Sequence, residues 1–131
     1  MLLRTRVGAR THRQLVVWQL ANELRKRVFE FTSAERVKGD EDYCRQIRRA
    51  INSACHNTAE GFNRYRHREF ANSLHIARGE LGEVDDQLEA GKQAGHLTPE
   101  ECEELLALCS RAVAANTALL RHLEKRAKDT P

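Results

Sequence analysis

The chain has 131 residues, and its 22 Lys and Arg against 19 Asp and Glu give a formal net charge of +3. This length suits one domain with a real core, and apolar residues recur regularly through its last predicted helix, which excludes general disorder. No apolar run approaches the ~20 residues that cross a bilayer, and the basic start lacks the apolar segment of a secretory signal. We therefore expect a cytoplasmic protein with no membrane partner.

The composition favours an all-α protein, because it has only two prolines, few aromatic residues and abundant Ala, Leu, Glu and Arg. Residues 1–12 are predicted to be a flexible basic tail, and residues 13–128 a single domain. The first helix is expected from about Arg13 to Thr32. Its apolar residues follow a seven-residue phase: Val17, Ala21, Leu24, Val28 and Phe31.

The second helix is predicted to begin after Asp40, a suitable N-cap residue that is followed by two acids favoured at the positive end of a helix dipole. We expect Gly61 to end this helix in the left-handed conformation that glycine tolerates. The apolar stripe of the helix consists of Ile47, Ile51, Ala54 and Thr58.

The third helix is expected from about Arg66 to Ala94, and Gly95 is expected to stop it. The fourth helix opens with Thr98-Pro99-Glu100-Glu101, which combines a capping box with proline at the first helical position. Small residues of the third helix predict a close approach of a neighbouring helix: Gly79, Gly82, Ala90, Gly91 and Ala94. The stripes are Phe70, Leu74, Ala77, Leu81, Val84 and Leu88 on the third helix, and Cys102, Leu105, Cys109, Ala112, Asn116, Leu119 and Leu123 on the fourth.

Four amphipathic helices with short joints predict an antiparallel up-down-up-down four-helix bundle. Helices one and four carry more apolar surface than one stripe requires, which indicates either a wide core-facing arc or a subunit interface. The extra residues are Leu15, Val16, Trp18, Leu20, Leu106, Leu108 and Val113. We expect burial of Trp18, Leu24, Ile47, Ile51, Phe70, Leu74, Leu81, Leu105 and Leu119.

The four cysteines are expected to be reduced core residues. Cys44 and Cys55 lie eleven positions apart in one predicted helix, and Cys102 and Cys109 lie seven apart in another. At 1.5 Å rise per residue these pairs are roughly 16 Å and 10 Å apart, too far for a disulfide within one helix. Bridging between helices or a redox role remains the alternative.

Charge is divided unevenly along the chain. Residues 1–68 hold 15 Lys and Arg against 7 Asp and Glu, and residues 69–131 hold 7 against 12. An antiparallel bundle would bring the chain start, the joint between helices two and three, and the end of helix four to one basic end, opposite an acidic end. The first turn of helix three is basic and its C-terminal half acidic, so helix dipoles do not explain this pattern.

The basic residues at that end are either a solvated surface or a binding site for anions or nucleic acid. The candidate contacts to RNA or DNA phosphates are Arg64, Arg66, Arg68, Arg121, Lys125, Arg126 and Lys128, with Arg48 and Arg49 in second rank. Arg48 and Arg49 have a competing structural role, a bridge to Glu60 or to an acid of helix three. Few aromatic residues are available for base stacking, so binding should be weakly sequence-selective and salt-sensitive. The rival hypothesis is a protein-interaction scaffold with no nucleic-acid role.

Motifs of catalysis are missing from the sequence. It contains no phosphate-binding glycine loop, GxSxG or HExxH, and no histidine follows a glutamate by three positions as in di-iron bundles. We therefore expect a protein that is not an enzyme and that uses no catalytic residue, cofactor or metal.

Several segments resemble the bacterial 23S rRNA intervening-sequence proteins. The resemblance covers roughly residues 14–125 and departs from the family pattern at Thr58, usually isoleucine, and at Glu80, usually serine. It is carried by LVVWQLANEL, QIRRA, NTAEGFNRYRHREF and SLHIARGELGEVDDQL, with Trp18, Arg48, Arg49, Asn57, Glu60, Gly61, Arg64, Phe70, Ala77, Gly79 and Glu83 in the expected order.

This resemblance implies a four-helix bundle in the cytoplasm without assigned enzymatic activity. Related bundles serve as accessory proteins of diversity-generating retroelements, where they form homopentameric rings that bind nucleic acid and a reverse transcriptase. The resemblance therefore implies a homo-oligomer, with five subunits, and RNA, DNA or a protein as further partners.

Overall fold

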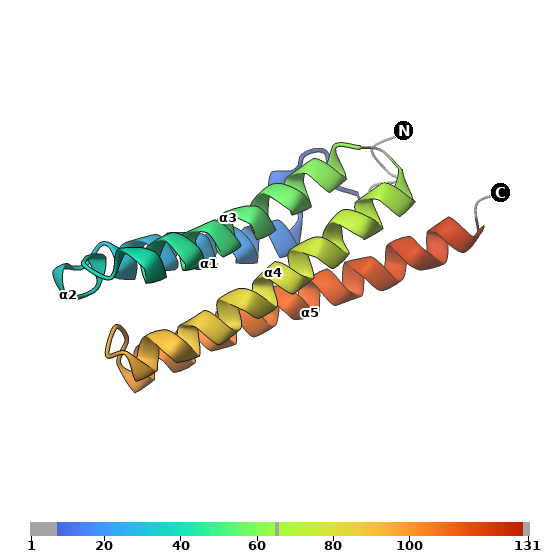
Figure 1. Cartoon of the computed structure of the whole chain (residues 1–131). Coiled ribbons are helices and arrows are strands. Elements are labelled where there is room, and N and C mark those ends of the chain that lie inside the picture. Colours follow the sequence, from blue (N-terminus) through green and yellow to red (C-terminus); the bar gives the residue numbers. More distant parts are fainter. Residues whose placement is uncertain (1–7, 65, 130–131) are drawn as a thin grey trace.

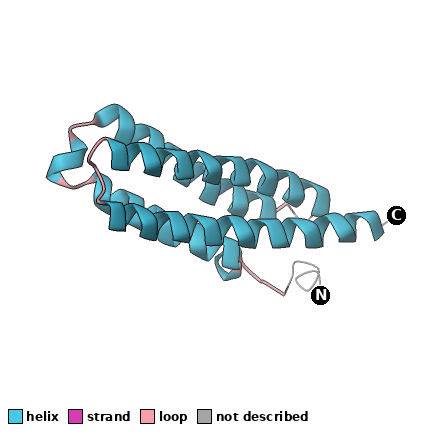
Figure 2. Cartoon of the chain, turned by 90° about the horizontal axis from the view of Figure 1, so that it is seen from below, coloured by secondary structure: helices cyan, strands magenta, loops and turns pink. Residues whose placement is uncertain are grey.

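A computed structural model describes residues 8–64 and 66–129, with side chains described as far as residue 126. Every regular element in this part of the chain is a helix (Figure 2), which confirms the all-α prediction. The elements are η2 (His12–Gln14), α1 (Val16–Thr32), α2 (Glu35–Lys38), α3 (Glu41–Phe62), α4 (His67–Gln93) and α5 (Pro99–Asp129).

The four long helices pack in a ring, in which α3 contacts α1 and α4, and α5 contacts α4 and α1. Figure 1 shows α2 and the α4–α5 joint at one end, which we call the α2 end. The α3–α4 joint, the start of the described chain and the end of α5 lie at the other, which we call the joint end. The three predicted regions of positive charge therefore do meet at one end of the bundle.

The core consists of two apolar clusters separated by a thin layer of small and polar side chains. The cluster nearer the α2 end includes Leu24, Ile51 and Leu81, and the cluster at the joint end includes Phe62 and Leu74. One residue of each long helix fills the layer between them, and all four are at most 1% exposed: Ala21, Thr58, Ala77 and Asn116. Asn116 is held there by a 2.9 Å hydrogen bond from its amide nitrogen to the carbonyl oxygen of Leu74.

Two predicted core residues are only partly buried. Trp18 packs on the joint-end cluster from outside it, with its ring edge against His12 at a centroid distance of 5.2 Å. Leu119 is also partly buried, and Leu120 takes the core position with 2% exposure. In a straight helix with 3.6 residues per turn, positions seven apart differ by ~20° around the axis. Late in a long helix, a strict seven-residue repeat therefore predicts burial of a residue next to the one that faces the core, here Leu119 instead of Leu120.

Most predicted helix boundaries are confirmed. Asp40 is the N-cap of α3 and accepts a hydrogen bond from the Tyr43 amide at 3.4 Å. Thr98 and Glu101 form the capping box of α5, with bonds of 2.8 and 3.0 Å. Gly95 follows α4 with a φ of 82°, which explains why glycine ends that helix.

Three boundaries differ from prediction. The first helix begins at Val16 rather than Arg13, after the short turn η2. The first connection contains the unpredicted helix α2. Residues 1–7 of the predicted tail lie outside the described residues, but Ala9 belongs to the joint-end cluster and is 5% exposed.

The prediction for Gly61 was wrong, because this residue lies inside α3, and Asn63 caps the helix with a φ of −81°. A Cβ atom at Gly61 would lie 2.5 Å from the Cβ of Ser73 on α4. Glycine is needed here because α3 and α4 approach closely, and not for its backbone freedom.

Gly91 of α4 marks a second close approach of these two helices, at the α2 end. A Cβ atom at Gly91 would lie 2.2 Å from the Tyr43 hydroxyl of α3.

Gly79 and Gly82 do not mark a close approach, contrary to the prediction. Both are exposed, and nothing lies within 4 Å of a Cβ built on either. The helix periodicity places them on the outer face of α4, while Gly91 faces α3.

The cysteine prediction is confirmed, since all four thiols are free and buried. Burial raises the pKa of Cys55 to about 11 and that of Cys109 to about 12. Both are therefore protonated near neutral pH. Cys102 and Cys109 donate hydrogen bonds to carbonyl oxygens of α4, at 3.5 and 3.3 Å, so they act as core residues.

The core assignment predicts a large cost for truncating Leu74, which is fully buried. A Leu74→Ala variant should lose about 2–5 kcal/mol of unfolding free energy through lost transfer energy and a cavity. Urea denaturation followed by circular dichroism measures this loss. An Ile76→Ala variant is the matched control on the same helix, because Ile76 is 49% exposed, and its effect should stay within about 0.5 kcal/mol.

Gly61 lies in a tight helix contact and Gly79 faces open space. Replacing each of them by alanine should therefore have opposite effects on the free energy of unfolding. Gly61→Ala should destabilise the fold by about 1–3 kcal/mol, since α3 and α4 must move apart. Gly79→Ala should stabilise it by about 0.4–1 kcal/mol, because alanine fits open helical backbone and restricts the unfolded chain. Thermal and urea unfolding of both variants test the pair, and two changes of the same sign would contradict the assignment.

Candidate nucleic-acid interface

The α3–α4 joint is shaped by the tight contact of the two helix ends. Gly61 admits Ser73 and Phe70 of α4, and Phe62 packs edge-on against Phe70 at a centroid distance of 6.0 Å. The chain therefore reverses between the end of α3 and the start of α4, and Asn63, Arg64 and Arg66 are exposed there. Arg64, Arg66 and Arg68, the first-ranked candidates, are all exposed.

Two of these three arginines are engaged by nearby carboxylates. Arg64 lies 3.5 Å from Glu60 and 3.4 Å from Glu69, and Arg66 lies 3.6 Å from Glu69. Exposed ion pairs of this kind contribute about 0–1 kcal/mol, so a phosphate can compete for these guanidinium groups. Arg68 makes no ion pair with any described residue, so its charge is uncompensated.

The end of α5 brings a second group of cations to the joint end. Leu120 and Leu123 point into the joint-end cluster, which leaves Arg121, Lys125 and Arg126 exposed. Within the described part of the chain, Arg121 and Lys125 have no carboxylate partner, whereas Arg126 is engaged. The side chain of Lys128 lies outside the described residues.

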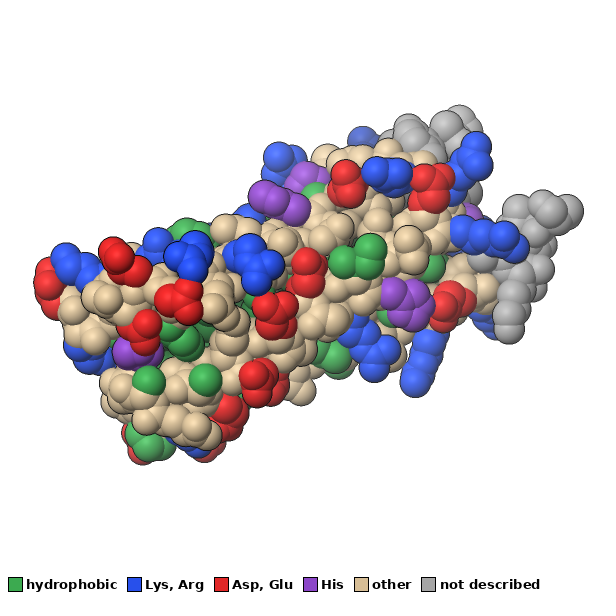
Figure 3. Space-filling view, viewed as in Figure 1, with side chains coloured by type: hydrophobic (Ala, Val, Ile, Leu, Met, Phe, Trp, Pro, Cys, Tyr) green, Lys and Arg blue, Asp and Glu red, His purple; other side chains and the backbone are tan. Residues whose placement is uncertain are grey.

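Acids are present at the joint end as well. Besides Glu60 and Glu69, Glu124 of α5 lies 3.0 Å from the imidazole of His75 on α4. Figure 3 shows Lys and Arg side chains at this end with acidic ones between them. The end is positively charged on balance, and among the candidate residues Arg68, Arg121 and Lys125 make no ion pair with a described residue.

The α2 end was predicted to be acidic, and the structure shows bases there as well. Its acids are matched by bases, and Figure 3 shows both signs mixed there. Three ion pairs account for much of this: Arg36–Glu101 at 3.3 Å, Lys38–Glu35 at 2.8 Å and Lys92–Glu89 at 3.3 Å. Charge separation between the ends is therefore weaker than the sequence indicated.

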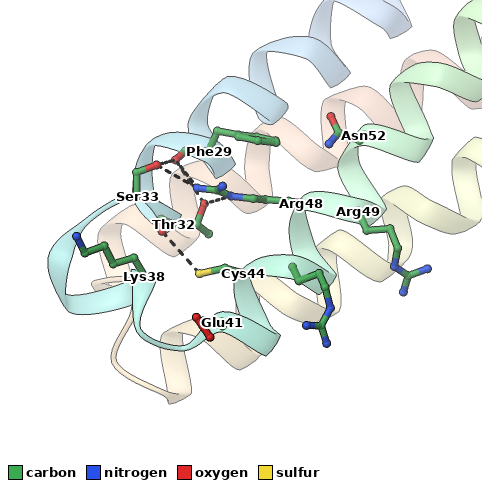
Figure 4. A pocket seen from close by; sticks show the side chains of 10 residues that line it. Phe29, Thr32, Ser33, Lys38, Glu41, Cys44, Arg48, Arg49 and Asn52 are labelled. Carbon is green, nitrogen blue, oxygen red and sulfur yellow. Dashed lines mark hydrogen bonds between the residues drawn. The ribbon is translucent and has the colours of Figure 1, made fainter.

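Arg48 and Arg49 lie away from the joint end, on the first half of α3. Arg49 lies 3.8 Å from Glu83 of α4, so the predicted bridge to an acid of that helix is confirmed for this residue. Arg48 points toward the last turn of α1 instead (Figure 4). Its Nε donates to the Thr32 hydroxyl at 2.8 Å, and one terminal nitrogen donates to the Ser33 hydroxyl at 3.0 Å. Both arginines are thus separated from the other candidates.

Arg48 lines a shallow groove of about 730 Å³ between α1, α2 and α3 (Figure 4). The sequence did not lead us to predict this groove, although three of its bases, Arg45, Arg48 and Arg49, have the spacing of one helix face. The complete lining is Phe29, Thr32, Ser33, Lys38, Glu41, Cys44, Arg45, Arg48, Arg49 and Asn52.

Other kinds of site find little support in the described residues. No group of three or more His, Cys, Asp or Glu side chains among them is arranged to hold a metal ion. Glu80 is the carboxyl group with a raised pKa, caused mainly by burial. It accepts a hydrogen bond from Asn57 at 3.0 Å, and this neutral partner makes it a structural bridge between α3 and α4.

The fold and the site define a class: small all-α bundles with a basic joint between their second and third long helices. A family model described as 23S rRNA-intervening sequence protein matches residues 13–117, and the chain belongs to this family. No curated protein matches it in sequence. In the described part of the chain, none of the helices has the length and apolar character required to cross a bilayer.

Proposed function

We propose that this protein is a non-enzymatic, oligomeric accessory protein that binds phosphates of RNA or DNA at its joint end. The observation that carries the proposal is the cluster of exposed cations at this end, of which Arg68, Arg121 and Lys125 have no carboxylate partner among the described residues. Membership of a family described by its link to ribosomal RNA insertions agrees with a nucleic-acid partner.

The expected mode of binding is electrostatic. A ligand that gains most of its affinity from phosphate neutralisation releases counterions, so its binding weakens steeply with salt. Trp18 is partly buried against the core and makes a T-shaped ring contact with His12, so part of its surface is already used and less is left for base stacking. We therefore propose weak sequence selectivity.

The four free thiols support a reducing compartment. We propose the cytoplasm as the location, because the joint-end cations would meet nucleic acid there.

An Arg68/Arg121→Ala double variant should bind structured RNA and duplex DNA more weakly than the wild type. Loss of two phosphate contacts should flatten the plot of log affinity against log salt by roughly 1.8 for duplex DNA. Fluorescence anisotropy at several salt concentrations measures both quantities. Substitution of Arg64 or Arg66 should reduce the affinity less, because each of these arginines has to break an ion pair with a glutamate before it binds a phosphate.

The matched control is an Arg78/Arg111→Ala variant. Arg78 and Arg111 are exposed and without ion pairs among the described residues, and each lies ten positions, about 15 Å, from its counterpart on the same helix. The control removes the same amount of charge, but away from the joint end. It should therefore weaken binding much less than the Arg68/Arg121→Ala variant does. Equal affinity and slope in both variants would favour the rival function, a protein-interaction scaffold.

Self-association is part of the proposal, and five subunits follow from the family resemblance alone. The apolar surplus predicted on the first and last helices is mostly used inside the bundle. Leu15 and Leu108 are buried, and four more of these residues are partly buried against the core: Trp18, Leu20, Leu106 and Val113. Val16, at 61% exposure, and Ile76 are the large apolar side chains left exposed in the described chain. Val16, the more exposed of the two, is the first candidate for a contact between subunits.

Light scattering coupled to size exclusion should give a mass several times the 15.0 kDa of one chain, and five times for a pentamer. A Val16→Glu variant should lower this mass if Val16 lies in the contact. An acid in the first turn suits the dipole of α1, so the fold itself should tolerate the change. A wild-type mass of 15.0 kDa at micromolar concentration would exclude the oligomer.

A further inference from the structure

Two partly buried arginines on the α1–α3 surface make their hydrogen bonds to neutral groups and have no carboxylate partner among the described residues. Arg48 of α3 is bonded to the hydroxyl groups of Thr32 and Ser33 and lies 3.5 Å from the carbonyl oxygen of Phe29. Arg25 of α1 is bonded only to side-chain amide oxygens, of Asn22 at 2.8 Å and of Asn52 at 3.4 Å. All these partners are neutral.

The two guanidinium groups belong to one surface. Asn52, the partner of Arg25, lines the groove that contains Arg48. Arg25 and Phe29 are four residues apart on α1, and Arg48 and Asn52 are four apart on α3, so each pair occupies consecutive turns of one face. Arg48 thus lines the groove and Arg25 borders it through Asn52. Neither guanidinium group is paired with a described carboxylate.

Arg48 is held in a fixed orientation. Its guanidinium carbon lies 4.5 Å from the centre of the Phe29 ring, and its bonds to α1 use Nε and one terminal nitrogen. The other terminal nitrogen makes no hydrogen bond with a described residue and keeps its N–H groups available. An anion that binds there does not have to order a flexible side chain.

Capping of α1 accounts for part of this arrangement, because a cation near a helix C-terminus stabilises the carbonyl end. It does not account for Arg25, which lies in the middle of α1, nor for the other bases of the lining. Lys38, Arg45 and Arg49 line the groove too, against the single acid Glu41. Each of these three bases is paired with its own exposed carboxylate. Because exposed ion pairs contribute only about 0–1 kcal/mol, a phosphate can displace these carboxylates.

We infer that the α1–α3 groove binds a phosphate group, with Arg48 as the donor in its lining and Arg25 as a second donor at its border. The guanidinium fork matches the oxygens of phosphate, and the two uncompensated charges match a group that carries one or two negative charges. The phosphate belongs either to a small molecule or to the backbone of a nucleic-acid strand. The site is separate from the joint end and does not depend on the function proposed there.

Side-chain NMR of the full-length protein tests this inference. Inorganic phosphate is titrated at constant ionic strength while the Nε–H signals of Arg25 and Arg48 are followed. Saturable shifts of both signals are expected. Arg48→Gln and, separately, Arg25→Gln should each weaken phosphate binding by about tenfold or more, as expected for loss of a charge-assisted hydrogen bond.

Two further variants separate binding from a structural role. Arg111→Gln is the matched control, an exposed and unpaired arginine on α5, and should leave phosphate affinity unchanged. Arg25→Gln keeps the bonds of Arg48 to α1, so it reports on the groove even if Arg48→Gln unfolds. Absence of saturable shifts in the wild type, or equal losses in Arg111→Gln and the groove variants, would overturn the inference.

Adenosine monophosphate and a short single-stranded oligonucleotide distinguish the two sources of phosphate. If the oligonucleotide displaces phosphate and shifts Arg25 and Arg48, the groove takes a nucleic-acid strand. If only the mononucleotide does so, the groove takes small phosphorylated molecules. Binding of oligonucleotide that depends on Arg68 and Arg121 alone, with no phosphate effect at the groove, would overturn this inference and leave the joint-end function intact.

Discussion

The close packing of α3 against α4 is the constraint on which the rest of this bundle depends. A glycine marks each end of the contact: Gly61 of α3 lies against Ser73, and Gly91 of α4 lies against Tyr43, whose hydroxyl donates to the Gln87 carbonyl at 2.7 Å. Side chains at these points would separate the helices, because cores do not absorb an extra carbon without strain. The tight joint that presents the arginines follows from this packing.

The other face of α3 packs against α1, and there the structure accommodates charge in a different way. Most bases near the helix ends are paired with exposed acids one turn away or on a neighbouring helix. Arg25 and Arg48 are instead partly buried among hydroxyl, amide and carbonyl oxygens. Neutral partners satisfy donors without cancelling charge, so these positions retain a positive potential that exposed ion pairs lose.

The distribution of uncompensated charge therefore matters more than the number of basic residues. The joint end holds many cations, but Arg64 and Arg66 share two glutamates. No described carboxylate is paired with Arg68, Arg121 or Lys125 at that end, with Arg48 in the groove, or with Arg25 beside it. At these two places an anionic ligand meets cations that it does not have to separate from a described carboxylate, next to further cations that it does.

The sequence by itself determined the all-α class, most of the buried residues and the caps at Asp40, Gly95 and Thr98, because heptad phase and capping depend on neighbours within a few positions. Tertiary structure decided the role of Gly61, the burial of Leu120 rather than Leu119, and the partners of Arg48. It also decided which arginines are neutralised. These features depend on which atoms of other helices lie opposite a residue, and helix periodicity predicts which face is apolar but not what faces it.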